Sequence, residues 1–378
     1  MGVSSIKANG NAGHAVAANQ LQAEGSRAPL SSLVEKLACE HALSLKEYER
    51  LIAERTDESA LDLRKRAVAA RREIYGTDVF VRGLIEFTNV CRNDCYYCGI
   101  RAGNASCDRY RLSSEQIFSC ADEGYRHGFR TFVLQGGEDP IQTDERLCAL
   151  VAGLKERHPD CAVTLSVGER SRESYERLFA AGADRYLLRH ETADPAHYAK
   201  LHPQEMSFEN RMRCLRDLKD IGFAAGCGFM VGTPYQTPAH LAKDLKFVEA
   251  FQPDMCGIGP FIPHEATPFA HEPAGSGDLT CYLLSIIRLI HPTVLLPATT
   301  ALGTLWADGY ERGILSGANV IMPNLTPPEG RRRYRLYNGK QVGDESLADR
   351  KTRLALQMEA IGYHIVVGRG DPRRKKQA

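Results

Sequence analysis

The stretch GLIEFTNVCRNDCYYC, residues 83–98, starts with a short apolar run and passes directly into a polar loop that carries three cysteines. The apolar run at 84–87 has the length and composition of a buried strand. A helical pattern at 114–127 and a second β-like run at 131–134 follow. A strand, a helix and another strand in this order predict a βαβ unit with parallel strands, so the cysteine loop would leave the carboxyl end of the first strand.

The same alternation continues along most of the chain. Further β-like runs lie at 162–166, 185–188, 225–231, 255–261, 294–298 and 319–322. Further helical patterns lie at 144–157, 171–181, 207–221, 238–250, 279–290, 309–316 and 347–361. Eight such units in about 280 residues predict an α/β fold, a (β/α)8 TIM-type barrel, whose chemistry would sit at the carboxyl ends of the strands. The alternative is a doubly wound open sheet, but no GxGxxG motif follows the first strand.

The remaining segments predict the domain organisation. Residues 1–28 are rich in Ala, Gly, Asn and Ser without periodicity, which is typical of a disordered leader. Helical patterns at 29–75 predict N-terminal helices that pack on the barrel, which itself would span 76–365. We interpret residues 366–378 as a solvated basic tail.

The composition narrows the class of protein. The chain has 378 residues, 43% hydrophobic and 25% charged, with a net charge of +1. This balance is ordinary for a soluble globular protein and gives no field that would attract nucleic acid or an anionic membrane. With neither a membrane-spanning run nor a signal-peptide pattern, we expect a cytoplasmic protein. Its twelve cysteines should then be thiols or metal ligands rather than disulfides.

Three of these cysteines, Cys91, Cys95 and Cys98, have the spacing CxxxCxxC. Thiolates are the usual ligands of iron–sulfur clusters, and three of them would leave one iron of a 4Fe-4S cubane without a protein ligand. An open iron suits a cluster that binds and acts on a substrate. Two alternatives are a zinc site and three core cysteines. Cys107 is a further candidate for a fourth ligand.

A CxxxCxxC loop directly after the first barrel strand resembles the radical S-adenosylmethionine (SAM) superfamily. The resemblance implies that the amino and carboxylate groups of SAM chelate the open iron, and that an electron from the cluster cleaves SAM to give a 5′-deoxyadenosyl radical. It also implies that Tyr97 lies by the adenine. The motif Gly136-Gly137-Glu138 after the second strand would meet the methionyl amino group.

Longer blocks are similar to the HydE family of FeFe-hydrogenase maturases. They include residues 86–101, 133–140, 183–192, 207–211, 257–264, 297–301 and 318–324, and the similarity extends over about residues 35–365. The resemblance implies action on a cysteine-bound iron carbonyl cyanide unit during assembly of the hydrogenase H-cluster. It implies a SAM pocket completed by Gln135, Thr164, Glu191 and Arg211, with Arg211 pairing the carboxylate. It implies a substrate cavity lined by Arg82, Arg189, Thr299, Thr300, Tyr334 and Tyr337.

These roles are chemically reasonable, but each residue also has a possible structural role. Guanidinium groups suit carboxylates, and arginines beside threonine hydroxyls suit an anionic substrate. Residues 189–191 could instead form a structural polar layer at the barrel mouth. Thr299 and Thr300 could satisfy backbone groups at a strand end, and the two tyrosines could anchor the C-terminal segment.

The resemblance also implies partners: the maturases HydG and HydF, and an electron donor such as ferredoxin or flavodoxin. Some relatives carry cysteines near the C-terminus for a second cluster, but the last cysteine here is Cys281, so we expect no second cluster. Two other functions remain open. One is a biotin synthase-like or methylornithine synthase-like radical SAM enzyme that acts on an organic substrate, and the other is a non-catalytic iron–sulfur carrier.

Overall fold

The computed structural model describes residues 1–2, 28–340 and 345–373. Most of the predicted leader, at 3–27, and residues 374–378 of the predicted basic tail lie outside the described residues. None of the described helices is long and apolar enough to cross a membrane.

Parallel strands form a closed barrel. Six of them are neighbours in the order β2 (Gly83–Thr88), β3 (Thr131–Gly136), β4 (Ala162–Ser166), β5 (Arg185–Leu187), β6 (Ala224–Cys227) and β8 (Met255–Cys256). Single parallel bridges close the circle, joining Met255 to Leu295, Pro297 to Val320 in β10 (Val320–Ile321), and Asn324 to Leu84. The predicted barrel is therefore confirmed, although the run at 294–298 joins it through isolated bridges only.

Short extensions continue the strands at both ends. Near the carboxyl ends, β7 (Met230–Val231) pairs with β9 (Gly259–Pro260). At the opposite end, β1 (Asp78–Val81) lies between β10 and β11 (His364–Val366). The apolar runs did not indicate β1 or β11, because these strands are short and pair outside the main circle.

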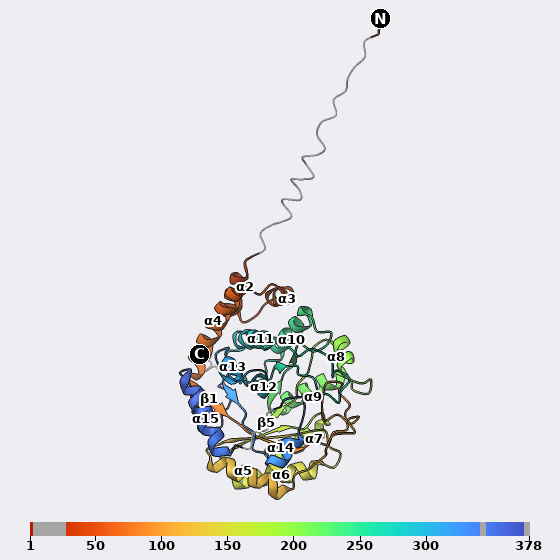
Figure 1. Ribbon diagram of the computed structural model, residues 1–378, viewed down its shortest axis with the longest axis vertical. Helices are drawn as coiled ribbons and strands as arrows, with labels where there is room; N and C mark the ends of the chain where they lie inside the picture. Colours follow the sequence, from red (N-terminus) through yellow and green to blue (C-terminus); the bar gives the residue numbers. More distant parts are fainter. Residues whose placement is uncertain (3–27, 341–344, 374–378) are drawn as a thin grey trace.

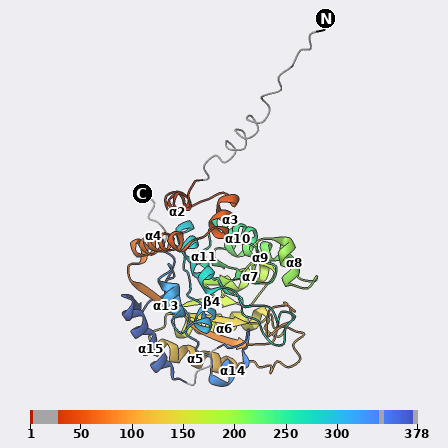
Figure 2. The ribbon, with the colours of Figure 1, turned by 45° about the horizontal axis from the view of Figure 1, so that its top comes forward.

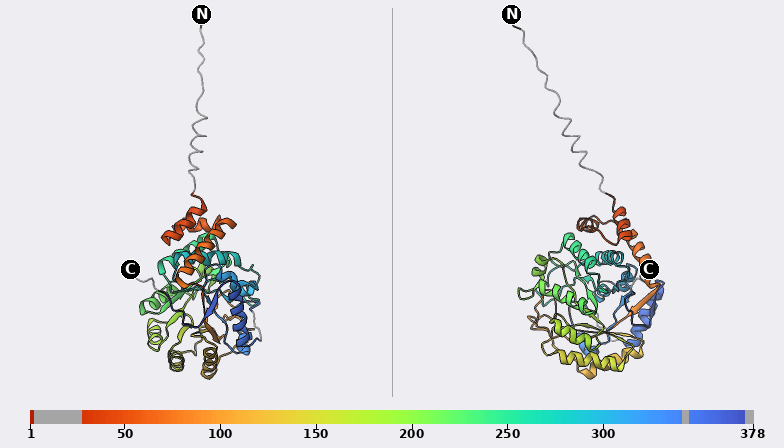
Figure 3. Two further views of the ribbon diagram at one scale, coloured as in Figure 1. Left: turned by 90° about the vertical axis from the view of Figure 1, so that its left-hand side faces the viewer. Right: turned by 180° about the vertical axis from the view of Figure 1, so that it is seen from behind.

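The helices surround the strands as a ring (Figure 3). The main ones are α5 (Ser114–Arg126), α6 (Asp144–Arg157), α7 (Arg172–Ala180), α9 (Phe208–Ile221), α10 (Pro238–Phe251), α11 (Gly277–Ile290), α13 (Gly309–Ile314) and α15 (Leu347–Ala360). Polar caps explain where many of them start: the Ser171 and Ser207 hydroxyls, for example, accept bonds from backbone N–H groups of the first turn. Short helices α8 (Pro195–Leu201), α12 (Thr300–Leu305) and α14 (Pro328–Arg333) lie in the connecting loops.

Three N-terminal helices, α2 (Leu30–Glu40), α3 (Leu45–Ala53) and α4 (Asp57–Tyr75), lie outside this ring (Figures 1 and 2). Helix α3 packs on α10, and α4 packs on α11. Residues 366–373, interpreted from the sequence as part of a basic tail, instead lie against the barrel. Val366 pairs with Phe80, and Asp371 accepts a hydrogen bond of 2.7 Å from the buried Arg185.

Candidate active site

The loop with Cys91, Cys95 and Cys98 leaves the carboxyl end of β2 as predicted, and all three thiols are partly buried. Backbone bonds fix it to three distant segments: Arg92 N–H to Glu138 O (3.0 Å), Tyr96 N–H to Leu201 O (3.0 Å) and Gly99 N–H to Leu336 O (2.9 Å). A loop without helix or strand needs such partners for its backbone groups. The cysteines are thus held against the end of β3, the end of α8 and the C-terminal part of the chain.

Burial raises the pKa of all three thiols, and the neighbouring cysteines raise the pKa of Cys95 and Cys98 further, that of Cys98 to about 12. The thiols therefore do not ionise together without a compensating cation. A metal centre supplies that charge, because thiolates rather than thiols are the ligands.

The end of β3 approaches the cysteine loop closely. A Cβ on Gly137 would lie 2.4 Å from Val90 O and 2.6 Å from Cys91 Cβ, so only glycine fits there. The Glu138 carboxylate accepts hydrogen bonds from Glu169 N–H (2.8 Å) and from Arg92 Nε (3.1 Å). The Glu138 carboxylate therefore joins the cysteine loop to the end of β4. Its contact with a methionyl amino group stays a prediction.

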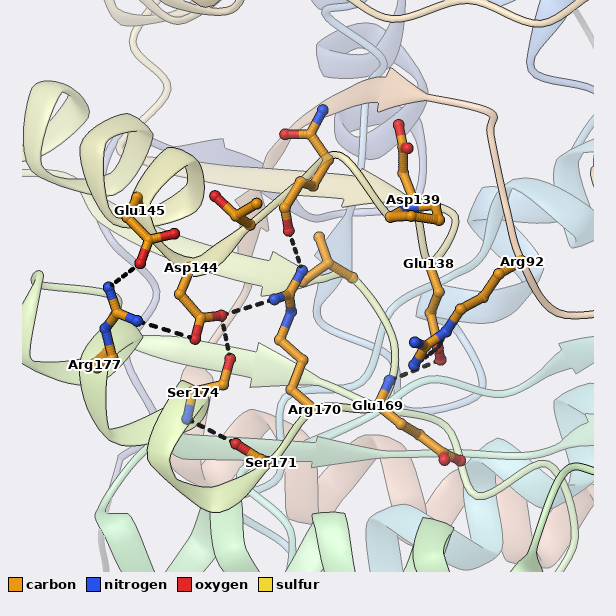
Figure 4. A pocket seen from close by; sticks show the side chains of 14 residues that line it. Arg92, Glu138, Asp139, Asp144, Glu145, Glu169, Arg170, Ser171, Ser174 and Arg177 are labelled. Carbon is orange, nitrogen blue, oxygen red and sulfur yellow. Dashed lines mark hydrogen bonds and ion pairs between the residues drawn. The ribbon is translucent and has the colours of Figure 1, made fainter.

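Beside this junction lies a polar cavity of about 410 Å³ (Figure 4). Asp144 at the start of α6 accepts bonds from Arg170 Nη1 (2.9 Å) and Arg177 Nη1 (3.4 Å), and Arg92 and Glu138 form its other side. The charged side chains that line this cavity thus already have ion-pair partners, two of them, Asp139 and Glu169, with arginines outside its lining.

Glu191 and Arg211 both contact Arg189 near the end of β5. Glu191 has φ of 65°, a left-handed conformation that is rare for a side chain of its size, and its N–H donates to Gly228 O at 3.0 Å. Its carboxylate lies 3.1 Å from Arg189 Nη2. The buried Arg211 guanidinium donates to Glu169 and to the carbonyl of Arg189. The structure brings the predicted residues of this group together and adds Glu169, whose position at a strand end was its only sequence signal.

Tyr97 has a partner that the sequence did not reveal. Its hydroxyl lies 3.1 Å from His202 Nε2, and His202 Nδ1 lies 3.0 Å from the carbonyl of Tyr198. Burial lowers the pKa of His202 to about 3, so its ring is neutral at pH 7. The Nδ1–H then donates to Tyr198, and Nε2 accepts from Tyr97.

Several predicted residues carry buried polar atoms without a hydrogen-bond partner. These atoms are Arg82 Nε and Nη2, Thr164 Oγ1, Arg189 Nε and Thr299 Oγ1, whereas Arg189 Nη2 and Glu191 Oε2 form the ion pair described above. Buried polar atoms in folded proteins are normally paired. Arg82 precedes β2, Thr164 lies in β4, and Arg189 and Thr299 follow barrel strands, so the unpaired atoms fit a barrel interior that binds a polar molecule.

The other predicted residues of the SAM pocket and the substrate cavity have partners or lie in other surroundings. Gln135 Nε2 donates to the Tyr334 hydroxyl at 3.5 Å, and Tyr334 is buried. Tyr337 is half-buried. Thr300 lines a separate cavity of about 350 Å³, together with Thr304 and Tyr310. Thr299 and Thr300, predicted to line one cavity, therefore have different surroundings because α12 begins between them.

The donor set fits a 4Fe-4S cluster with SAM. Within the described ranges, no three His, Cys, Asp or Glu side chains converge as ligands of one metal ion would. A 4Fe-4S cubane does not need three side chains that converge on one ion, because each thiolate binds a different iron. Three partly buried thiols on one loop, with the buried Arg211 near Cys95, meet that demand and leave a cationic group for an amino acid moiety.

Comparisons with known proteins agree with this site. Residues 85–248 match the model of the Radical SAM superfamily. The chain is 48% identical to the [FeFe] hydrogenase maturase subunit HydE of Thermotoga maritima over 276 residues, covering 73% of this chain and 78% of that protein. It is 28% identical to 3-methylornithine synthase of Methanosarcina acetivorans over 79% of this chain and 85% of that protein.

A solved structure of methylornithine synthase (PylB) has the same fold, with a TM-score of 0.75 and 25% identity over 88% of this chain and 97% of that chain. Radical SAM enzymes use a 4Fe-4S cluster and SAM, the cofactors predicted from the cysteine loop. The chain belongs to the radical SAM superfamily and, within it, to the HydE family of [FeFe] hydrogenase maturases.

Proposed function

We propose that this protein acts in assembly of the hydrogenase H-cluster, on a cysteine-bound iron carbonyl cyanide precursor. Identity of 48% to a HydE maturase supports this substrate class over the organic substrates of the more distant relatives. The polar atoms without partners at Arg82, Arg189 and Thr299 support it most directly. Arginines and hydroxyls suit an anionic molecule with a free carboxylate.

The residues then have distinct tasks. Cys91, Cys95 and Cys98 hold three irons and leave the fourth to the amino and carboxylate groups of SAM. When bound, the cluster and SAM supply a 5′-deoxyadenosyl radical through one-electron cleavage of the sulfonium. Arg211, oriented by Glu169, pairs with the SAM carboxylate.

The remaining SAM pocket consists of Tyr97, Gln135, Gly136, Gly137, Glu138, Thr164 and Glu191. The substrate would contact Arg82, Arg189, Thr299, Thr300, Tyr334 and Tyr337. We place the protein in the cytoplasm, with HydG and HydF as partner maturases and a ferredoxin or flavodoxin as electron donor.

The Thr299→Val variant tests this proposal. It removes an unpaired buried hydroxyl and keeps the side-chain shape, so the folded protein should be as stable as wild type or more stable. We expect uncoupled SAM cleavage to persist. Product formation from the HydG-made precursor should fall about tenfold, because the variant loses one hydrogen bond to the precursor. The measurements are 5′-deoxyadenosine and product formation by the anaerobically reconstituted enzyme.

Thr280→Val is the matched control, because its hydroxyl is equally buried but donates to Ser276 O at 2.8 Å. It should lower stability and leave substrate use unchanged. Equal turnover by Thr299→Val and wild type would contradict the cavity assignment. Turnover of an amino acid such as lysine in place of the precursor would favour the methylornithine synthase-like function. A cluster whose electron paramagnetic resonance signal does not change when SAM is added would favour the function of a non-catalytic iron–sulfur carrier.

A further inference from the structure

Two side chains outside the proposed cofactor contacts connect the two ends of the cysteine loop. The chain from residue 89 to residue 110 contains neither helix nor strand. Asn89 precedes the first cysteine, and Arg109 follows the third by eleven residues. Asn89 is completely buried, and Arg109 is half-buried.

Asn89 binds the backbone around Arg109. Its Nδ2 donates to Asp108 O at 2.8 Å and to Arg333 O at 2.8 Å, and its Oδ1 accepts from Tyr110 N–H at 2.7 Å. All of these partners are backbone groups. The side chain of Asn89 therefore fixes the segment 108–110 beside the end of β2.

Arg109 binds the backbone on both sides of the cysteines in return. Its Nη1 donates to Asn89 O at 2.6 Å and to Ile100 O at 2.8 Å. Its Nη2 donates to Arg101 O at 2.6 Å and to Asn104 O at 3.3 Å. One planar guanidinium thus joins Asn89, two residues before Cys91, to the turns after Cys98, which no single-centre donor such as an ammonium could span.

The charge of Arg109 is also distinctive within this loop. Arg92 forms an ion pair with Glu138 at 3.0 Å, and Arg101 forms one with Asp94. Arg109 bonds to neutral carbonyls, and no carboxylate of the described residues forms an ion pair with it. Its positive charge is therefore available to the anionic thiolates and sulfides that the loop would hold.

We propose that Arg109, fixed by Asn89, is a positioning residue that sets the spacing of the three cysteines before iron arrives and stabilises the reduced cluster through its charge. This inference rests on the proposed function only in assuming that the loop holds a cluster. The two roles are separable, because Arg109→Lys keeps the charge and loses the fork, whereas Arg109→Met loses both.

The test uses the full chain, reconstituted anaerobically with iron and sulfide. Iron release to an added chelator should be at least about tenfold faster in Arg109→Lys and Arg109→Met than in wild type, since each loses two or more carbonyl bonds. The midpoint potential of the cluster should shift to more negative values in Arg109→Met and stay near that of wild type in Arg109→Lys. A positive charge near the cluster favours the reduced, more anionic state.

Arg130→Lys is the matched control. Arg130 Nη1 also donates to two carbonyls, Tyr125 O (3.1 Å) and Phe129 O (2.9 Å), but at the start of β3, the end of the barrel away from the cysteines. It should release iron at the wild-type rate. Melting of the apo-proteins separates positioning from general folding: the Arg109→Lys apo-protein should melt no lower than the Arg130→Lys apo-protein.

The outcomes divide clearly. Iron release and potential equal to wild type in both Arg109 variants would overturn the inference, as would a melting loss in the Arg109→Lys apo-protein that exceeds that of the control. A wild-type protein that binds no iron would refute the proposed function itself. A wild type that cleaves SAM, with variants that behave identically, would refute only the role of Arg109.

Discussion

Two buried arginines in different parts of the molecule, Arg288 and Arg82, differ in how many of their guanidinium nitrogens have a hydrogen-bond partner. Arg288 on α11 is fully buried, and every nitrogen of its guanidinium has a partner. The partners are Gly317 O (2.8 Å), Pro292 O (2.7 Å), Val294 O (2.8 Å) and Asn319 Oδ1 (3.2 Å). Arg82, between β1 and β2, is 4% exposed, yet its Nε and Nη2 have no partner.

The surroundings of Arg82 explain the difference. Its Nη1 reaches Met255 Sδ on β8, at 2.9 Å, across the barrel from β2. Burial and the neighbouring Arg185 both lower the pKa of Arg82. A buried charge with few hydrogen bonds costs stability, and we expect a bound molecule to supply the missing partners of Arg82. Burial does not distinguish Arg82 from Arg288, whereas the number of paired guanidinium nitrogens does.

The strongest test of the functional end of the barrel is Cys95→Ala. Loss of one thiolate from three should abolish reductive SAM cleavage, a fall of at least about 10³-fold, which is typical when an essential group is removed. The apo-protein should unfold at nearly the same denaturant concentration as wild type, because the contact of the Cys95 thiol with Met206 Sδ, at 3.7 Å, is weak. The assay is 5′-deoxyadenosine release with dithionite as reductant.

Cys148→Ala is the control for that variant. Cys148 lies on α6 and is half-buried, as Cys95 is, but it belongs to a helix of the outer ring. It should retain iron and activity. Equal SAM cleavage by Cys95→Ala and Cys148→Ala would remove the cysteine loop from the chemistry.

Arg288→Met should have the largest effect on stability. It removes the guanidinium that donates to three backbone carbonyls between α11 and the strand run at 294–298 or close to them. We expect the free energy of unfolding to fall by about 3–5 kcal/mol, as when one partner of a buried polar network is lost. Urea unfolding of the apo-protein measures it. The exposed Arg312→Met should change the same free energy by less than about 0.5 kcal/mol, and a similar small change in Arg288→Met would show that its bonds contribute little.

Local patterns predicted the fold well and the site only in part. The apolar runs located the barrel strands, and α6 begins and ends where its pattern predicts, at Asp144 and Arg157. The cysteine spacing located the loop that would hold the cluster. Contacts between distant residues were not predictable: the Tyr97 hydroxyl meets His202, which is 105 residues away in the chain. The spacing of cysteines along the sequence indicates the ligands within one loop. A pair such as Tyr97 and His202 depends instead on which loops the fold brings together.

Arg82→Met is the counterpart of Arg288→Met. Because a guanidinium with two unpaired nitrogens is replaced by an apolar chain, the free energy of unfolding should stay equal or rise by about 1 kcal/mol. Turnover of the precursor should fall while SAM cleavage continues. The same urea titration and the product assay measure both effects. Destabilisation as large as that of Arg288→Met would mean that Arg82 is a structural residue whose partners the fold supplies.

The smallest effect concerns pH and the buried His202. An unfolded histidine takes up a proton near pH 6.5, whereas burial holds the pKa of His202 in the folded protein at about 3. Between these values the unfolded chain binds more protons, so stability falls as pH falls below 6.5 and is unaffected by this group above pH 7.

His202→Gln removes that proton uptake, while a glutamine amide oxygen can still accept from the Tyr97 hydroxyl. Its stability should depend less steeply on pH than that of wild type, by up to about 1.4 kcal/mol per pH unit. Urea unfolding of the apo-protein at pH 5 and pH 7.5 measures the slope, with the exposed His271→Gln as a control that keeps the wild-type slope. Parallel slopes for His202→Gln and wild type would place a proton on His202 in the folded protein. Tyr97 would then lose the acceptor that orients it, and the tyrosine beside the third cysteine would be held by packing alone.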